Sequence, residues 1–254
     1  MMPRSERADS PVLPSRWWRA VLLIAAAAVV GGCASPPTTT YTDASGETVT
    51  VDWSDYPADP YTDIDDVLAL PTAEEVDQRW AAVRAAVIAA IESELAGEFG
   101  DLEWRSRGDD GWHPYGGNGY GGQTMLEVYN SAGWEAEVSL PEEAWPRVID
   151  AAERELASWG IDGAGDLAGP GDPDTSEWLL VGDFFQHGEF MSVSVQDARE
   201  DEQALKDAEQ YDHLISGITL FYGIQTISRE DEDAFIRAAA PFEGLTRPEP
   251  THSD

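Results

Sequence analysis

The sequence predicts an α+β fold in which an antiparallel sheet of about five or six strands carries two long helices on one face. Two stretches place apolar residues at steps of three and four, as amphipathic helices do. Several short stretches instead alternate apolar with polar residues, as strands do. Short links between neighbouring strands favour antiparallel pairing, and this mixture of elements is typical of an α+β domain. We expect one such domain over residues 72–245.

The chain opens with a stretch typical of export. Arg16 and Arg19 precede an unbroken apolar run over residues 20–30. The run is shorter than the roughly 20 residues that span a membrane, and it fits a secretory signal. Its ending, Val30-Gly31-Gly32-Cys33, resembles a bacterial lipobox, in which the cysteine thiol receives a diacylglyceryl group and the chain is cut just before it. We therefore predict a lipoprotein signal peptide over residues 1–32 and a lipid on Cys33, with a plain secretory signal as the alternative.

This signal predicts a protein held by its lipid on the extracytoplasmic face of the cell membrane. The composition excludes other modes of attachment, because 49 acidic residues face only 15 basic ones and the net charge is −34. Neither nucleic acid nor an anionic leaflet binds such a surface through clustered Lys and Arg. We ascribe the charge to solubility in an ion-rich exterior, with a cation-binding role as the alternative. Cys33 is the single cysteine, so an intramolecular disulfide and a thiolate metal cluster are both excluded.

Residues 33–71 are predicted to be an acidic flexible tether. From residue 34 onward this segment contains no basic residue, and polar segments of one charge sign tend to stay extended. Val49, Val51 and Trp53 alternate with polar residues, so a short strand remains possible there.

The first half of the domain should hold both long helices. The spacing Thr72 to Glu75 matches a capping box and starts the first helix, which should end at Gly97 and Gly100. Its predicted buried stripe is Val76, Trp80, Val83, Val87, Ile91 and Leu95. A second capping box at residues 139–142 should start the other helix, whose stripe runs from Trp145 to Trp159. Strands are expected between the helices at 102–106, 124–130 and 134–138.

The second half of the domain should complete the sheet. Its predicted strands are 177–181, 189–195 and 218–226, with a connection at 182–188 between the first two. Residues 162–174 are a loop by composition, and the acidic run 197–212 should be an excursion between strands. A short helix carrying Phe235 and Ile236 follows Ser228, and the tail 246–254 should be disordered.

The most unusual stretch is a glycine-rich loop at residues 107–123, which contains the candidate binding residues Trp112, His113, Tyr115 and Tyr120. Its G-x-G-x-x-G match runs into a strand rather than a helix, so we reject a nucleotide site. One hypothesis is that the loop presents its aromatic residues to a partner or a glycan, since Trp and Tyr are enriched in binding hot spots. The hypothesis we favour is that these residues fold back and cover the sheet.

Other site motifs are weak. Asp162, Asp166, Asp172 and Asp174 offer oxygen ligands for a hard cation, but their spacing does not match an EF-hand, and an acidic surface loop is the favoured interpretation. The sequence contains no H-E-x-x-H, G-x-S-x-G or P-loop motif. Histidines do not cluster in it either: His113, His187, His213 and His252. We therefore predict no catalytic residue, no metal ligand and no cofactor.

Three short motifs and the lipobox point to a known family. They are Leu102-Glu103-Trp104-Arg105, Gly108-Asp109-Asp110-Gly111-Trp112 and Trp145-Pro146-Arg147. Over roughly residues 72–226 the chain resembles the LppA-like lipoproteins of mycobacteria and related actinobacteria. The resemblance implies an anchored envelope protein of undetermined biochemical role, with no catalytic residues to carry over. The excursion 197–212 has no place in that family's pattern.

Our leading interpretation is a non-enzymatic lipoprotein whose acidic domain contacts another envelope component, either a protein or a glycan. The alternative is an envelope hydrolase or glycan-modifying enzyme of unrecognised type.

Overall fold

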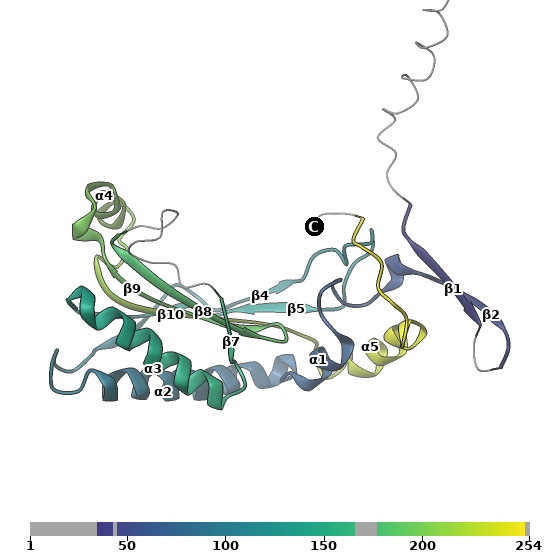
Figure 1. The fold of residues 1–254 in the computed structure, drawn as a ribbon, viewed down its shortest axis with the longest axis horizontal. Coiled ribbons are helices and arrows are strands. Elements are labelled where there is room, and N and C mark those ends of the chain that lie inside the picture. Colours follow the sequence, from purple (N-terminus) through teal and green to yellow (C-terminus); the bar gives the residue numbers. More distant parts are fainter. Residues whose placement is uncertain (1–34, 43–44, 166–176, 252–254) are drawn as a thin grey trace, which may run out of the picture. The chain divides into compact units, whose positions relative to one another are not determined.

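An eight-stranded antiparallel sheet organises the fold (Figure 1). Six of its strands follow the order β3-β6-β10-β9-β8-β7, and β5 pairs with β10 on one side and with β4 on the other. In the computed structural model, which describes residues 35–42, 45–165 and 177–251, the central strand β10 (Ser216–Thr226) pairs with β9 (Glu189–Asp197) along one edge. Its other edge pairs with two strands in succession, β6 (Gly133–Glu137) and β5 (Glu127–Asn130). The remaining strands are β3 (Trp104–Arg107), β4 (Gly111–Pro114), β7 (Gly163–Ala164) and β8 (Leu179–Gln186).

A β-bulge lies between β5 and β6. Asn130 pairs with Gly223 and Trp134 pairs with Leu220, so three residues on one strand face two on the other. Ser131 holds the bulge, because its amide donates to the Tyr222 carbonyl at 2.8 Å and its Oγ accepts from the Tyr222 amide at 3.0 Å. Because of this extra residue, the core-facing side chains of β5 and of β6 point to the same, helix-covered face of the sheet.

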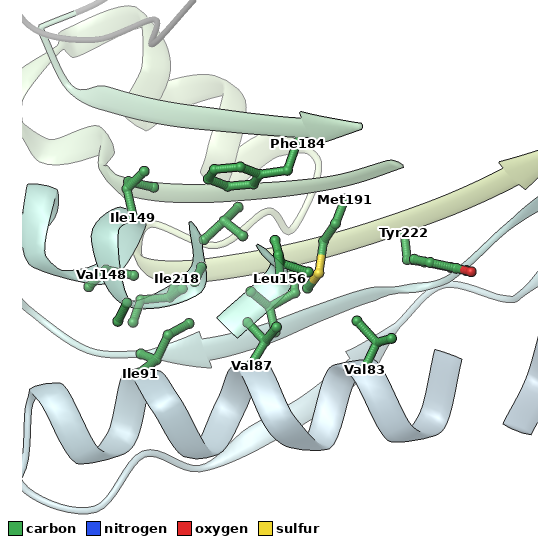
Figure 2. Packing of buried hydrophobic residues seen from close by; sticks show 14 of the residues in the cluster. Val83, Val87, Ile91, Val148, Ile149, Leu156, Phe184, Met191, Ile218 and Tyr222 are labelled. Atoms are coloured by element: carbon green, nitrogen blue, oxygen red, sulfur yellow. The ribbon is translucent and has the colours of Figure 1, made fainter. Parts of the chain in front are cut away.

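Two long helices cover that face, as the sequence predicts. They are α2 (Val76–Glu94) and α3 (Trp145–Ser158), and Figure 2 shows Val83, Val87 and Ile91 pointing from α2 toward the sheet. Alternation along β9 buries every second side chain against them. The main hydrophobic core includes, from the helices, Val76, Trp80, Val83, Val87, Ile91, Trp145, Val148, Ile149, Ala152 and Leu156, and from the strands, Phe184, Met191, Val193, Val195, Ile218, Leu220, Tyr222 and Ile224. The α+β prediction is confirmed.

The two helix starts differ in how well the sequence predicts them. At the first, the Thr72 amide donates to Glu75 Oε2 at 3.2 Å, as a capping box requires, and a 3-10 turn at Ala73–Glu75 leads into α2. At the second, a 3-10 turn at Glu142–Ala144 precedes α3, and Pro141 caps it without a side-chain hydrogen bond. The capping box predicted at 139–142 is therefore wrong, because Ser139 Oγ instead accepts from Arg199 Nη2 at 2.8 Å.

The connection predicted at 182–188 is mostly strand. β8 continues to Gln186, and the turn to β9 contains His187 and Gly188, both with positive φ, at 51° and 90°. Two residues of positive φ give the kind of turn that suits a two-residue hairpin. Gly182 does not break the strand; a Cβ there would lie 2.8 Å from Ile149 Cγ2, so the glycine lets α3 pack closely on β8.

The acidic excursion forms a helix on the other face of the sheet. After a 3-10 turn at Ala198–Glu200, α4 (Glu202–Gln210) lies on the side opposite α2 and α3 (Figure 1). Asp201 caps it by accepting from the Ala204 amide at 2.8 Å. Asp212, with φ 55°, ends it, and the His213 amide donates to the Ala208 carbonyl at 2.8 Å.

The predicted flexible tether differs from the structure, which places most of residues 36–71 in secondary structure. This segment forms the hairpin β1 (Thr38–Thr42) and β2 (Thr48–Asp52), a 3-10 turn at Trp53–Asp55 and the helix α1 (Ile64–Ala69). A second hydrophobic cluster anchors it: Val51, Trp53, Tyr56, Ala58, Val67, Tyr120, Leu126, Ile227, Phe235 and Phe242. The acidic composition of this segment predicted an extended chain, but its apolar side chains are buried because distant segments pack against them.

The C-terminal segment also joins this cluster. After α5 (Glu232–Ala239) and a 3-10 turn at Ala240–Phe242, Arg247 Nη1 donates to the Pro60 carbonyl at 2.9 Å. The Thr251 amide donates to the Gly119 carbonyl at 2.9 Å. The predicted disordered tail is therefore wrong as far as Thr251. The predicted signal peptide 1–32 and Cys33 lie outside the described residues, among which no helix is long and apolar enough to cross a membrane.

Candidate functional site

The four candidate residues of the glycine-rich loop 107–123 do not lie together in the structure. Tyr120 is completely buried and Tyr115 is half-buried, and both pack into the second cluster. Trp112 and His113 lie on β4 and are exposed, Trp112 by 40 %, with the Trp112 ring centroid 5.2 Å from that of Tyr129. Burial raises the pKa of the Tyr120 phenol to about 12. The inward-facing aromatics thus contact the N-terminal segment rather than the sheet alone.

Asn118 holds this loop in place, a role that the sequence analysis missed. Its buried Nδ2 donates to the carbonyls of Trp53, Ser54 and Tyr56 at 3.1, 3.0 and 2.8 Å. Its Oδ1 accepts from the amides of Tyr120 and Gly122 at 3.0 and 2.9 Å. The glycines permit this contact: a Cβ at Gly122 would lie 1.7 Å from the Ser54 carbonyl oxygen. The unusual composition of the loop therefore serves a close approach of two backbones.

A cleft of about 800 Å³ lies elsewhere, beside the start of α2. We call it the Arg79 cleft. Its walls come from α1, from the first turns of α2, from the end of α3 and from the turn between β8 and β9. The charged and polar residues that line it are Asp66, Glu75, Gln78, Arg79, Gln186, His187 and Glu189, with Trp159 as its aromatic wall.

A buried ion pair forms the floor of the Arg79 cleft. Arg79 holds Glu189 in a bidentate contact, with Nε to Oε1 at 2.9 Å and Nη2 to Oε2 at 3.0 Å. Arg79 Nη2 also donates to the Trp159 carbonyl at 2.8 Å, and the Tyr222 hydroxyl donates to Glu189 Oε1 at 2.7 Å. Only 5 % of the Glu189 side chain is exposed. Both charges are therefore paired and hydrogen-bonded, as buried charges must be.

The pKa shifts agree with this network. Burial acts to lower the pKa of Arg79, but the hydrogen bond and charge of Glu189 raise it above its ordinary value. Burial and the Glu189 charge raise the pKa of the Tyr222 phenol far above its ordinary value. Near neutral pH, Arg79 stays charged and Tyr222 stays a hydrogen-bond donor. The group links α2, the end of α3, β9 and β10.

A histidine–aspartate pair lies at the rim of the same cleft. His187 Nδ1 is 2.8 Å from Asp66 Oδ2, and the two side chains are 43 % and 31 % exposed. The positive φ of His187 in the hairpin turn aims the ring toward α1. Of the other histidines that the sequence analysis considered, His113 and His213 lie outside this cleft and His252 lies outside the described residues.

The charged groups on the floor of the Arg79 cleft are paired with one another. The Glu189 carboxylate already accepts three hydrogen bonds, and the lining residues of the cleft include no Ser, Thr or Cys. Among the described residues there is also no group of three His, Cys, Asp or Glu that could hold a metal ion. The predicted cation loop lies mostly outside the described residues, which include Asp162 but not Asp166, Asp172 or Asp174.

Sequence reasoning missed the Arg79–Glu189 pair because its members are 110 residues apart and form no motif. One signal was present. Glu189 precedes Met191, Val193 and Val195 at the period of a strand, so it occupies an inward-facing position where a carboxylate needs a buried partner.

The fold is an α+β domain with an antiparallel sheet, two long helices on one face and clefts lined by polar residues. A family model described as "LppA: Lipoprotein confined to pathogenic Mycobacterium" matches residues 58–177. Over these residues the chain is similar to the LppA family, as its sequence motifs indicate, and the match begins inside the segment predicted as a tether.

Other comparisons add little. A crystal structure of the lipoprotein LppA from Mycobacterium tuberculosis aligns with 67 % of this chain and 86 % of that one, at 8 % identity and a TM-score of 0.41. A comparison with curated proteins gives no match.

Proposed function

We propose that this protein is a lipid-anchored envelope lipoprotein, attached through Cys33 at the extracytoplasmic face of the cell membrane. The observation that carries the proposal is the sequence Val30-Gly31-Gly32-Cys33 at the end of a short apolar run with basic residues before it. The match to a family of lipoproteins supports it. Two acyl chains give stable anchoring, whereas one gives only marginal binding.

The anchor would hold the folded unit close to the membrane. Five positions separate Cys33 from Thr38, where β1 begins, and an extended chain spans at most about 3.5 Å per residue, or about 17 Å in total. The segment that the sequence predicts as a long spacer is mostly folded. We therefore propose that the partner, an envelope protein or a glycan, meets the domain near the membrane surface.

We further propose that the domain binds rather than catalyses. The charged groups on the floor of the Arg79 cleft satisfy one another. The His187–Asp66 pair is the feature that would favour the alternative, an envelope hydrolase, because an oriented histidine can act as a general base.

The anchor is tested by Cys33→Ala in the native host. The variant should remain unprocessed or be released, whereas Ser35→Ala, two positions further on, should fractionate with membranes like the wild type. A Cys33→Ala protein found in the membrane fraction with the wild-type mass would contradict the proposal.

Binding and catalysis are separated by incubating the purified protein with isolated cell-wall glycan and analysing the products by mass spectrometry. Binding without new products is expected. New fragments that disappear with His187→Ala would establish the hydrolase instead.

A further inference from the structure

A second pocket lies on the opposite face of the sheet, under α4. We call it the α4 pocket. It has a volume of about 370 Å³, at the small end of the range for small-molecule sites. Its floor is formed by the outward-facing side chains of β6, β9 and β10, and the excursion 197–212 with the residues that follow it forms its roof. Figure 1 shows α4 above this face of the sheet, away from α2 and α3.

The floor of the α4 pocket contains a carboxylate that lacks a hydrogen-bond partner. Glu135 on β6 lines the pocket, and only 9 % of its side chain is exposed. Its Oε2 is buried and accepts no hydrogen bond. Arg107 Nη1 lies 3.7 Å from that oxygen, too far for a hydrogen bond, and Arg107 Nη2 donates to the Tyr211 carbonyl at 3.2 Å. A buried acceptor left in this state costs free energy, which a donor in the pocket would recover.

The remaining lining defines what kind of donor fits. Trp178, Leu214 and alanines of the roof form an apolar wall, and Ser194, Gln196 and Thr219 add short polar groups. Two carboxylates, Glu135 and Asp207, face one guanidinium, Arg107, so the formal charge of the lining is −1 with His213 neutral. The whole chain, at −34, adds a field that favours cations.

We propose that the α4 pocket binds a small organic ammonium ion, a protonated amine on an apolar body. The Glu135 carboxylate accepts from the ammonium N–H, and the apolar body packs against Trp178 and Leu214. An indole also attracts a cation that lies over its face. The site is separate from the Arg79 cleft and does not depend on the lipid anchor. It gives the acidic excursion 197–212 a function as the roof of a binding site.

The test uses two probes of similar size that share a benzyl group, the charged benzylammonium and the neutral benzyl alcohol, titrated calorimetrically into the full-length protein in mild detergent. We expect saturable binding of benzylammonium with a Kd of about 1 mM, an affinity ordinary for a ligand of this size. Benzyl alcohol should bind at least about tenfold more weakly, because it lacks the positive charge that pairs with the Glu135 carboxylate. Equal affinities for the two probes, or no saturable binding of the amine, would overturn the proposal.

Two matched variants locate the site. Glu135→Gln keeps the shape and removes the charge, so the affinity for benzylammonium should fall at least about tenfold. Glu137→Gln makes the same change two residues along β6, at a side chain that is 75 % exposed and outside the pocket, and should leave the affinity unchanged. An unchanged affinity in Glu135→Gln would refute the assignment. If that variant does not fold, the comparison of the two probes on the wild type decides alone.

Discussion

Replacing Asn118 by alanine should destabilise the protein strongly and free the N-terminal segment. The substitution removes five hydrogen bonds that a fully buried carboxamide makes to backbone groups. It leaves the buried amide of Tyr120 and the largely buried amide of Gly122 without this acceptor, and three carbonyls without this donor. The Trp53 carbonyl keeps a second partner, the Tyr56 amide at 3.0 Å, so it loses less. At about 1–3 kcal/mol for each buried group left unpaired, with partial relaxation, the cost is about 3–4 kcal/mol.

Urea unfolding followed by tryptophan fluorescence measures this loss, because Trp53 is 1 % exposed in the wild type. Limited proteolysis with a protease that cuts after acidic residues should show new cleavage between residues 55 and 66 in the variant. Gln123→Ala removes an exposed carboxamide from the same loop and should change the free energy of unfolding by no more than about 0.5 kcal/mol. A loss below about 1 kcal/mol in Asn118→Ala, without new cleavage, would refute the role assigned to this side chain.

Three further predictions concern other parts of the fold. Trp112→Ala should cost about 2 kcal/mol in denaturant melts, because the ring packs at a tilt against Tyr129 yet stays 40 % exposed; a change within about 0.5 kcal/mol would mean that the ring contributes no packing. Glu189→Ala should lower the free energy of unfolding by about 3–5 kcal/mol, because the Arg79 side chain, only 22 % exposed, would keep its charge but lose the carboxylate that pairs with it. A near-neutral result would contradict a buried ion pair. A neighbouring arginine holds the pKa of Asp197 below its ordinary value, so its stabilisation is complete above about pH 4 and lost as the pH falls through the lower folded pKa. Asp197→Asn should therefore flatten the fall of the unfolding free energy below pH 4, and an unchanged slope would exclude this carboxyl as a cause.

Local periodicity predicted the helix-covered core well. Val76, Trp80, Val83, Val87 and Ile91 are buried as their spacing requires, since an amphipathic helix fixes which face meets the sheet before any partner is known. The same applies to β9, whose alternation gave both its position and its buried side.

Features that depend on distant partners were not predictable in this way. Trp53 and Tyr56 look like isolated aromatics in an acidic stretch, and only the loop around Asn118, more than 60 residues away, makes them core residues. Gly182 looks like a break in a strand until the side chain of Ile149 is placed beside it. The composition of a segment indicates only its own structural preference. In both cases a residue far away in the sequence determines the structure.

The candidate sites follow the same rule. Neither the Arg79 cleft nor the α4 pocket contains a sequence motif, because each gathers side chains from several elements that are far apart along the chain. What the sequence did contain was a polar residue at a position where the strand period predicts burial, Glu189 on β9. An inward-facing carboxylate is thus a useful pointer to a site, although it does not name the partner.

The central claim is lipid anchoring at Cys33, and the intact mass of the protein extracted from membranes tests it most directly. The proposal predicts a chain that begins at Cys33 and carries the added mass of a diacylglyceryl group. A chain that retains residues 1–32, or one that starts at another residue and carries no lipid, would contradict it.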